Sequence, residues 1–205
     1  MLKIKAFTVG PIGTNCYVAY DSDTKEGILI DPGSFNERIV DFIKQNNITI
    51  KYTVNTHGHY DHIGGNKAFG YPVLIHEKDK ECFDNAIKNL SVMLGESLSL
   101  KSPHRLLKDK DEINVKGLSF RVIHTPGHTP GGITLECDNT LFTGDTLFYE
   151  GVGRTDIPFA NQVDLEKSLE KLMNYSDNTQ VLSGHGPAST IGHERKNNPF
   201  LLYKD

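Results

Sequence analysis

Four side chains of types that bind metal ions lie within six residues, His57-Gly58-His59-Tyr60-Asp61-His62. An apolar, β-branched run at 48–54 precedes them and predicts a buried strand, after which the backbone must bend. Alternate side chains of an extended segment point the same way, so we expect His57, His59 and Asp61 on one side and His62 turned toward a neighbouring position. The spacing therefore favours two adjacent metal ions. The competing interpretations are a histidine-rich surface loop and an Asp61 that only caps the helix expected after it.

The same local pattern, an apolar strand followed by a small-residue turn with one His or Asp, recurs three times later in the chain. His128 lies within the Pro- and Gly-rich turn 125–132, Asp145 follows a strand candidate at 140–142, and His185 follows one at 181–182. If these strands end at one edge of a layered α/β fold, the side chains meet the early cluster.

The chemical types of these seven side chains restrict the metal. Five imidazoles and two carboxylates without a thiolate suit Zn, Fe or Mn and disfavour Ca and Mg. Three histidines on one ion, two histidines and an aspartate on the other, and a shared aspartate leave a position open for water, which is typical of a catalytic centre. We therefore expect two divalent ions, with zinc first and iron or manganese as alternatives.

Other titratable residues have weaker patterns. Asp31 ends a strand before Pro32-Gly33, and we expect it to orient a metal-bound histidine, although it could be a turn former alone. We expect four further histidines not to bind metal: His76, His104, His124 and His193. The first three lack a glycine-framed turn at a strand end. His193 follows Gly192 but lies near the C-terminus.

Hydrophobic periodicity gives the elements that must position these residues. Strands are predicted at 2–9, 16–20, 27–30, 48–54, 73–75, 112–115, 119–123, 133–136, 140–142 and 181–182. The first three read as an antiparallel meander. Helices are predicted after a Ser34 cap, at 66–69 and at 163–173, so each half of the chain runs strands first and a helix afterwards.

The segment 76–104 is more charged than its surroundings and predicts a helix at 77–90 followed by a loose stretch. Met93, Leu94, Leu98 and Leu100 are apolar residues in this loop-like part. One hypothesis is a cover over the site, since long loops are often functional. The other is that these residues simply pack beneath the helix.

Composition sets the outer limits. A chain of 205 residues fits one domain, 1–205, and the net charge of −4 offers no basic field for nucleic acid. The alternating N-terminus predicts a strand and not a secretion signal, and no apolar run is long enough to cross a membrane. Three widely spaced cysteines fit a reducing cytoplasm. We expect a cytoplasmic monomer or weak oligomer that acts on a small molecule.

At this point the sequence resembles the metallo-β-lactamase superfamily over essentially its whole length. The residues that carry the resemblance are the H-x-H-x-D-H motif at 57–62, His128, Asp145, His185 and the strand-ending Asp31. The resemblance implies an α/β fold of the four-layer αββα type. It also implies one metal held by His57, His59 and His128, a second held by Asp61, His62 and His185, and Asp145 bridging both together with a hydroxide.

Within the superfamily, the stretches 14–17, 144–148 and 184–187 are similar to the glyoxalase II (hydroxyacylglutathione hydrolase) branch. Full-length glyoxalase II carries a C-terminal helical domain that holds glutathione, whereas this sequence ends at Asp205. The Gly153-Arg154-Thr155-Asp156 stretch keeps a cation but has a carboxylate in place of the family's tyrosine. It is similar to short, single-domain glyoxalase II-like hydrolases and to persulfide dioxygenases. Arg154 either binds a substrate carboxylate or pairs with Asp156 to fix the loop.

The function that this resemblance implies is hydrolysis of a thioester, hydroxyacylglutathione or a related acyl-thiol, by metal-activated hydroxide, with Asp61 and Asp145 as the catalytic carboxylates. The alternative is a mononuclear iron persulfide dioxygenase, which uses two histidines and one aspartate of the same set. A non-catalytic metal-binding module is less favoured because all seven ligands are present. β-Lactamases share the motif, but only the common scaffold points to that activity here. tRNA-processing nucleases also share it, but the acidic net charge of this chain disfavours binding of nucleic acid.

Overall fold

Two six-stranded sheets form the centre of the computed structural model, which describes residues 1–202. The predicted domain extends to Asp205, so its last three residues lie outside the described part. The first sheet has the order β1-β2-β3-β4-β5-β6. Its strands are β1 (Leu2–Val9), β2 (Thr14–Asp21), β3 (Glu26–Ile30), β4 (Thr49–Val54), β5 (Val73–His76) and β6 (Arg105–Leu107). The pairs β1–β2 and β2–β3 are antiparallel, as the meander predicted, and β3 to β6 run parallel.

The second sheet has the order β14-β13-β10-β9-β8-β7. Its strands are β7 (Glu112–Val115), β8 (Leu118–His124), β9 (Ile133–Cys137), β10 (Thr140–Gly144), β13 (Gln180–Ser183) and β14 (Ser189–Thr190). The neighbours β10 and β13 are parallel, and helix α4 (Gln162–Leu172) connects them. A small two-stranded ribbon, β11 (Leu147–Phe148) and β12 (Gly151–Val152), follows β10 directly.

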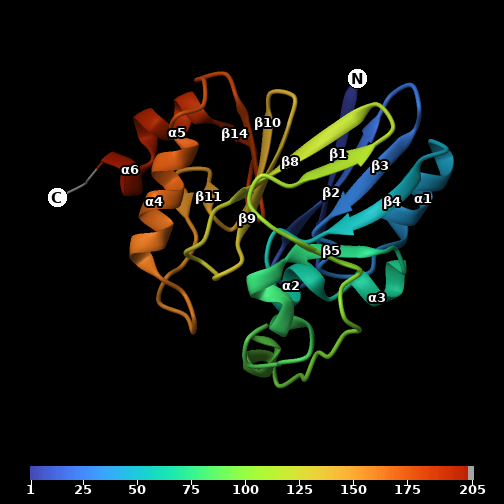
Figure 1. Ribbon diagram of the computed structural model, residues 1–205, viewed down its shortest axis with the longest axis horizontal. Helices are drawn as coiled ribbons and strands as arrows, with labels where there is room; N and C mark the ends of the chain where they lie inside the picture. Colours follow the sequence, from blue (N-terminus) through green and yellow to red (C-terminus); the bar gives the residue numbers. More distant parts are fainter. Residues whose placement is uncertain (203–205) are drawn as a thin grey trace.

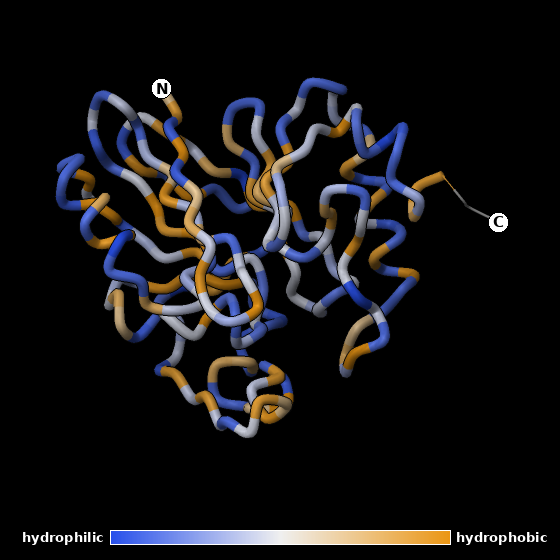
Figure 2. Tube along the Cα trace, turned by 180° about the vertical axis from the view of Figure 1, so that it is seen from behind, coloured by the Kyte–Doolittle hydropathy of each residue, from blue (hydrophilic) through white to orange (hydrophobic). Residues whose placement is uncertain are grey.

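The main hydrophobic core lies between the two sheets. Fully buried side chains of the first sheet, such as Ile28 and Ile30, belong to the same cluster as Phe120 and Phe142 of the second. Hydrophobic residues recur along the strands of both sheets in Figure 2. Burying this apolar surface from two sides is what makes the pair of sheets stable in water.

Helices cover the outer faces. Helix α1 (Glu37–Gln45) packs Ile39 and Ile43 onto the first sheet, and α4 packs Leu165 and Leu169 onto the second. Figure 1 shows α1 on one side of the molecule and α4 and α5 (Ile191–Asn197) on the other. The predicted four-layer αββα sandwich is therefore confirmed.

Helix starts follow capping chemistry. The side chain of Asn36 accepts a hydrogen bond from the backbone N–H of Arg38 at the start of α1, and Asn161 does the same for Asp164 at the start of α4. The prediction of Ser34 as the first cap was wrong by two residues, because the chain is irregular from Pro32, with a bend at Ser34, and turns helical only after Asn36.

The predicted helix at 77–90 was wrong in type and length. The structure has the 3₁₀ helix η1 (Glu77–Phe83) and a second one, η2 (Ser91–Leu94), with turns between them. The side chain of Asn85 accepts from the N–H groups of Ile87 and Lys88, and such local bonds compete with a continuous α-helix. Leu90 then adopts a positive φ of 63°, which ends any helical run.

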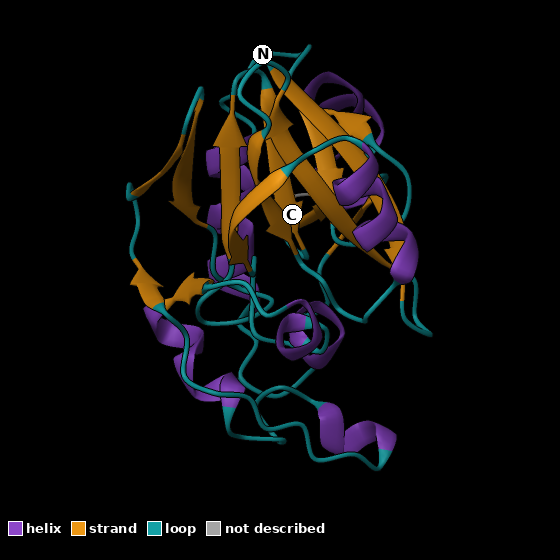
Figure 3. Ribbon diagram, turned by 90° about the vertical axis from the view of Figure 1, so that its right-hand side faces the viewer, coloured by secondary structure: helices purple, strands orange, loops and turns teal. Residues whose placement is uncertain are grey.

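Loops that follow the strands gather at one end of the sheets (Figure 3). The short helices α2 (Tyr60–Ile63) and α3 (Asn66–Phe69) lie there, and α6 (Pro199–Leu202) ends the described chain. Within residues 1–202, every helix is too short or too polar to cross a bilayer.

Candidate metal centre

Four strand ends meet where the loops gather. Shortly after β4 comes the stretch 57–62, His128 follows β8, Asp145 follows β10, and His185 follows β13. The structure therefore brings together all seven of the predicted side chains. Their donor atoms form two groups of three residues, and Asp145, which lies close to His57 and His62, is between them.

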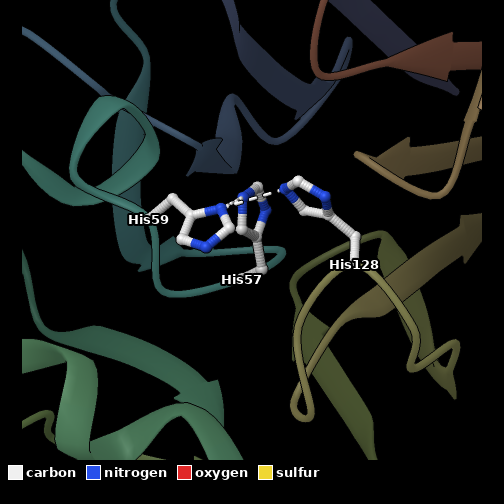
Figure 4. Close-up of side chains that lie close together, drawn as sticks. All are labelled: His57, His59 and His128. Carbon is white, nitrogen blue, oxygen red and sulfur yellow. Dashed lines mark hydrogen bonds between the residues drawn. The ribbon is translucent and has the colours of Figure 1, made fainter. Parts of the chain in front are cut away.

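The first group consists of His57, His59 and His128, all buried. His59 Nδ1 lies 3.0 Å from His57 Nε2 and 2.9 Å from His128 Nε2, so three ring nitrogens converge on one point (Figure 4). A tetrahedral ion with Zn–N bonds of about 2.0–2.1 Å places its ligand atoms roughly 3.3 Å apart. The spacing of the three nitrogens is thus close to that of one tetrahedral face.

The second group consists of Asp61, His62 and His185. Asp61 Oδ2 lies 3.2 Å from His62 Nε2 and 3.2 Å from His185 Nε2. This is the donor set that the family resemblance implied for a second ion.

Asp145 lies between the two groups. Its Oδ1 is 3.4 Å from His62 Nε2, and its Oδ2 is 3.5 Å from His128 Nε2 and 3.6 Å from His185 Nε2. One carboxylate therefore reaches both groups, which is the position that a ligand shared by two cations would need.

The alternation argument was wrong for Asp61. It placed Asp61 with His57 and His59, but the extended backbone ends at His59, which is the residue preceding α2. Asp61 and His62 lie in a helical turn, so their side chains no longer follow a period of two. Asp61 does not cap that helix; its Oδ2 accepts a 2.9 Å hydrogen bond from the hydroxyl of Thr14.

Buried atoms at the junction support a cation. His62 Nε2 and Asp145 Oδ1 are both inaccessible to solvent and have no hydrogen-bond partner among residues 1–202, although they lie 3.4 Å apart. Buried polar atoms in proteins are nearly always paired, so an unpaired nitrogen beside an unpaired carboxylate oxygen points to a group that both could bind. Together with the converging imidazoles, these atoms fit a metal ion.

The outer ring nitrogens of three histidines face acceptors. His128 Nδ1 donates to the carbonyl oxygen of Arg154 at 2.9 Å. His57 Nδ1 lies 3.2 Å from the hydroxyl of Thr56, which itself donates to Asp31 Oδ2 at 2.7 Å. A proton held on the outer nitrogen leaves the inner nitrogen as a lone pair aimed at the centre.

Asp31 serves both groups. Its Oδ2 lies 2.9 Å from His62 Nδ1 in addition to accepting from Thr56, and its Oδ1 accepts from the backbone N–H of Thr56 at 2.7 Å. The position agrees with the expected orienting role, and the carboxylate does more than form a turn.

Burial and charge drive the pKa values of the two groups in opposite directions. Burial lowers the pKa of His59 to about 3 and that of His57 well below its usual value, with neighbouring imidazoles lowering the latter further. Burial alone would also lower the pKa of His62, but the carboxylates of Asp61, Asp145 and Asp31 outweigh it and raise that pKa well above its usual value. His57 and His59 are therefore neutral at pH 7, whereas the carboxylates around His62 favour its protonated form.

Residues near the start of the chain hold the His185 loop. The amide of Asn15 donates to the carbonyls of Ser183 and Gly186 at 3.1 and 2.8 Å, and the hydroxyl of Tyr17 donates to Ser183 O at 2.6 Å. The stretch 14–17 carried part of the resemblance, but its sequence alone gave no reason for its role.

Asp79 is a buried site residue that the sequence reasoning missed. Its carboxylate accepts hydrogen bonds from Gly58 N at 2.9 Å, from Thr129 Oγ1 at 2.7 Å and from Gly131 N at 2.6 Å. Burial raises its pKa against these bonds, which lower it. Nothing distinguishes it in the charged run 77–81, and only its contacts across the fold identify it.

Arg154 pairs with Asp156 in the structure. The guanidinium donates to both carboxylate oxygens, at 2.8 and 2.9 Å, and the two side chains are 70% and 71% exposed. An arginine has five N–H donors, so three remain for another partner. The loop-fixing pair is therefore present, and binding of a substrate carboxylate remains compatible with it.

The four histidines expected to be uninvolved belong to none of the donor groups found in residues 1–202. His76 and His124 stack on each other with ring centroids 4.2 Å apart. His193 Nε2 lies 3.0 Å from Glu150 Oε1. These contacts give His76, His124 and His193 other roles.

The segment 76–104 projects beyond the sheets, as the green part of Figure 1 shows. Leu98 and Leu100 pack against the cluster of Ile63, Ile75 and Phe83, but Met93 is 69% exposed. Leu98 and Leu100 are thus packed as the second hypothesis expected, although not beneath an α-helix, whereas Met93 and Leu94 are exposed. A cover over the site stays a prediction.

Comparisons with known proteins agree with this geometry. The family model of the metallo-beta-lactamase superfamily matches residues 9–185. The chain is similar to the probable metallo-hydrolase YqgX of Bacillus subtilis, with 34% identity over 98% of both chains. It is also similar to the hydroxyacylglutathione hydrolase GloC of Haemophilus influenzae, with 34% identity over 99% of this chain and 100% of that one.

Solved structures include close matches. The B3 metallo-beta-lactamase BLEG-1 aligns with a TM-score of 0.91 and 35% identity, over 98% of this chain and 100% of that one. TTHA1623, in a di-iron-bound form, aligns with a TM-score of 0.84 and 31% identity, over 96% and 100%. ETHE1 from Myxococcus xanthus aligns with a TM-score of 0.76 and 26% identity, over 96% and 83%.

Proposed function

The chain belongs to the metallo-β-lactamase superfamily, and from this premise we propose that it is a binuclear metal-dependent hydrolase of a small acyl-thiol ester. The observation that carries the proposal is the convergence of seven donors in two groups joined by Asp145.

His57, His59 and His128 would hold one ion, Asp61, His62 and His185 the other, and Asp145 both. When bound, such ions lower the pKa of water toward about 7 and polarise a carbonyl group. The seven donors make zinc the first choice, and the di-iron form of TTHA1623 supports iron as an alternative to it.

The chain's own residues prepare the site for this chemistry. Neutral His57 and His59 offer lone pairs without losing a proton, and Arg154 O and the Thr56–Asp31 pair keep the rings of His128 and His57 in place. A leaving thiolate, whose acid has a pKa near 8.5, departs at neutral pH without a proton donor. The site therefore needs no serine or cysteine nucleophile.

Similarity to GloC supports a hydroxyacylglutathione or a related thioester as the substrate. Arg154, with three free N–H donors at the surface, is the residue that we assign to a carboxylate of that substrate. We further propose a cytoplasmic location, no nucleic-acid or membrane partner, and a monomer or weak oligomer.

The test is metal analysis of the purified protein beside a panel of thioesters. We expect two ions per chain and turnover of S-lactoylglutathione. Chelation and Asp145→Ala should each abolish this turnover. Added metal should restore it in the chelated wild-type protein. Full thioesterase activity in metal-free protein, or in Asp145→Ala, would refute the proposal. Thioesters of other thiols in the same panel identify the carrier.

Two other functions belong in the same panel because solved structures of the superfamily align with this chain. The match to ETHE1 is the reason to test the alternative of a mononuclear iron persulfide dioxygenase. Its assay is oxygen consumption with glutathione persulfide. Hydrolysis of a β-lactam is tested because of the match to BLEG-1. One iron per chain with oxygen uptake, or β-lactam turnover without thioester turnover, would replace the thioesterase assignment.

A further inference from the structure

A single carboxylate links the backbones of the two loops that carry the three-histidine group. Asp79 Oδ2 accepts from the N–H of Gly58, the residue between His57 and His59. The same oxygen accepts from the hydroxyl of Thr129, the residue after His128. The loop after β4 of the first sheet and the loop after β8 of the second are thus joined through one side chain.

The Asp79 carboxylate packs tightly against the loop that carries His128. Asp79 Oδ1 accepts from Gly131 N at 2.6 Å, and a Cβ built on Gly131 would lie 2.5 Å from that same oxygen. Only a glycine lets the loop approach the carboxylate this closely. Because both loops are hydrogen-bonded to the same carboxylate, the separation between His59 and His128 is restricted as well.

The carboxylate is completely buried, and it accepts hydrogen bonds from three neutral donors, Gly58 N, Thr129 Oγ1 and Gly131 N. Burying a charge without a cation is costly, and proteins keep such groups mainly where they pair or support a metal. The donors Gly58 and Thr129 are sequence neighbours of the three histidines, so a cation held by that group would compensate this charge.

We propose that Asp79 is a positioning residue for the three-histidine group: it sets the distance between the His57–His59 pair and His128 and thereby the metal affinity of that group. It does not touch the donors of the second group, Asp61, His62 and His185. The segment 76–104 is then a structural part of the metal centre, whether or not it also covers it.

The experiment compares metal affinity at the two groups in Asp79→Asn and in the wild type. Asparagine keeps the size, but its amide nitrogen would face an N–H or O–H donor in either orientation. Removing a hydrogen-bonded partner behind metal ligands lowers metal affinity by about 10–100-fold. We expect that loss at the three-histidine group alone. Zinc is titrated against a chromophoric chelator, and ¹⁵N-histidine NMR assigns each binding step to its imidazoles.

Glu194 provides a matched control. It is also completely buried, and it accepts hydrogen bonds from Glu150 N and Asn198 Nδ2 at 2.8 Å, away from the donor groups. Glu194→Gln should lower the thermal midpoint without changing either zinc affinity. If Asp79→Asn does not fold, Thr129→Val removes one of the three bonds and should weaken the same group, and Thr129→Ser should restore it.

The outcomes separate clearly. Wild-type zinc affinities in Asp79→Asn or Thr129→Val, or an equal loss at both groups, would overturn the positioning role. Since the readout is metal binding and not turnover, the result does not depend on which thioester the enzyme hydrolyses. Wild-type protein that binds no metal would instead refute the proposed function.

Discussion

Asp31 Oδ2 lies 2.9 Å from His62 Nδ1, and both side chains are almost completely buried. Through Thr56 the same oxygen also supports His57, so one carboxylate orients a histidine in each donor group. Asp31→Asn keeps the shape but removes the charge. We expect metal affinity to fall by about 10–100-fold at both groups, because the orienting partner of each ring is weakened. Zinc titration against a chelator measures the affinity of each group. Unchanged affinity at both groups would contradict the role of Asp31.

The pH dependence of metal binding should differ between the groups. The raised pKa values of His62 and His185 mean that the metal-free second group holds protons that a metal must displace. Its metal affinity should therefore fall as pH drops through those raised values. His57 and His59 should release no proton when metal binds near pH 7, because the pKa of His59 is about 3 and that of His57 is also lowered.

Calorimetry of zinc binding in buffers of different ionisation enthalpy measures this proton release directly. More protons should leave with the ion that binds Asp61, His62 and His185. In the metal-free protein, the ion pairs of His62 should stabilise the fold fully below pH about 6.5, the usual histidine pKa, and lose that contribution as pH rises through the raised value. Equal proton release for both ions would count against this assignment.

Gly184 allows the two groups to meet. A Cβ at this position would lie 2.1 Å from Asp145 Oδ1 and 2.7 Å from His62 Cε1. Gly184→Ala should displace both side chains and lower kcat/KM for the thioester by about 100-fold, the cost expected for a misplacement near 1 Å. Gly186→Ala is the control on the same loop. It has open space and a φ of 77°, so it should cost about 1 kcal/mol of stability and spare turnover. Similar turnover in both variants would refute the prediction.

Arg154→Ala separates substrate binding from loop fixing. Its exposed ion pair with Asp156 contributes less than about 1 kcal/mol, so the thermal midpoint should barely change. We expect KM for a carboxylate-bearing thioester to rise about tenfold with kcat unchanged, the loss of one exposed charge-assisted contact. Asp156→Asn leaves the guanidinium in place and should not raise KM. Equal increases in the two variants would show that the pair only fixes the loop.

Most strands could be predicted from the sequence because hydrophobic periodicity is local. The strands β1 and β7 have the predicted bounds, and the other predicted strands differ by one or two residues at their ends. The region 77–94 was predicted wrongly, because the Asn85 side chain accepts from nearby N–H groups and the Asn89 side chain donates to the carbonyls of Cys82 and Leu98, which the hydrophobic pattern does not show. Propensity in the charged run favoured a helix that these contacts replace.

By itself, the sequence determined which side chains end the strands, and so the chemical character of the centre: five imidazoles and two carboxylates at turns built from small residues. Tertiary structure alone decided how they are divided. Asp61 joins His185 and not His59, because the chain turns helical after His59 and because β13 ends beside it. Asp79 also gains its role only there, since its partners lie 21 to 52 residues away. A local pattern fixes the direction of a side chain relative to its own backbone, whereas the meeting of distant strand ends depends on the packing of the two sheets.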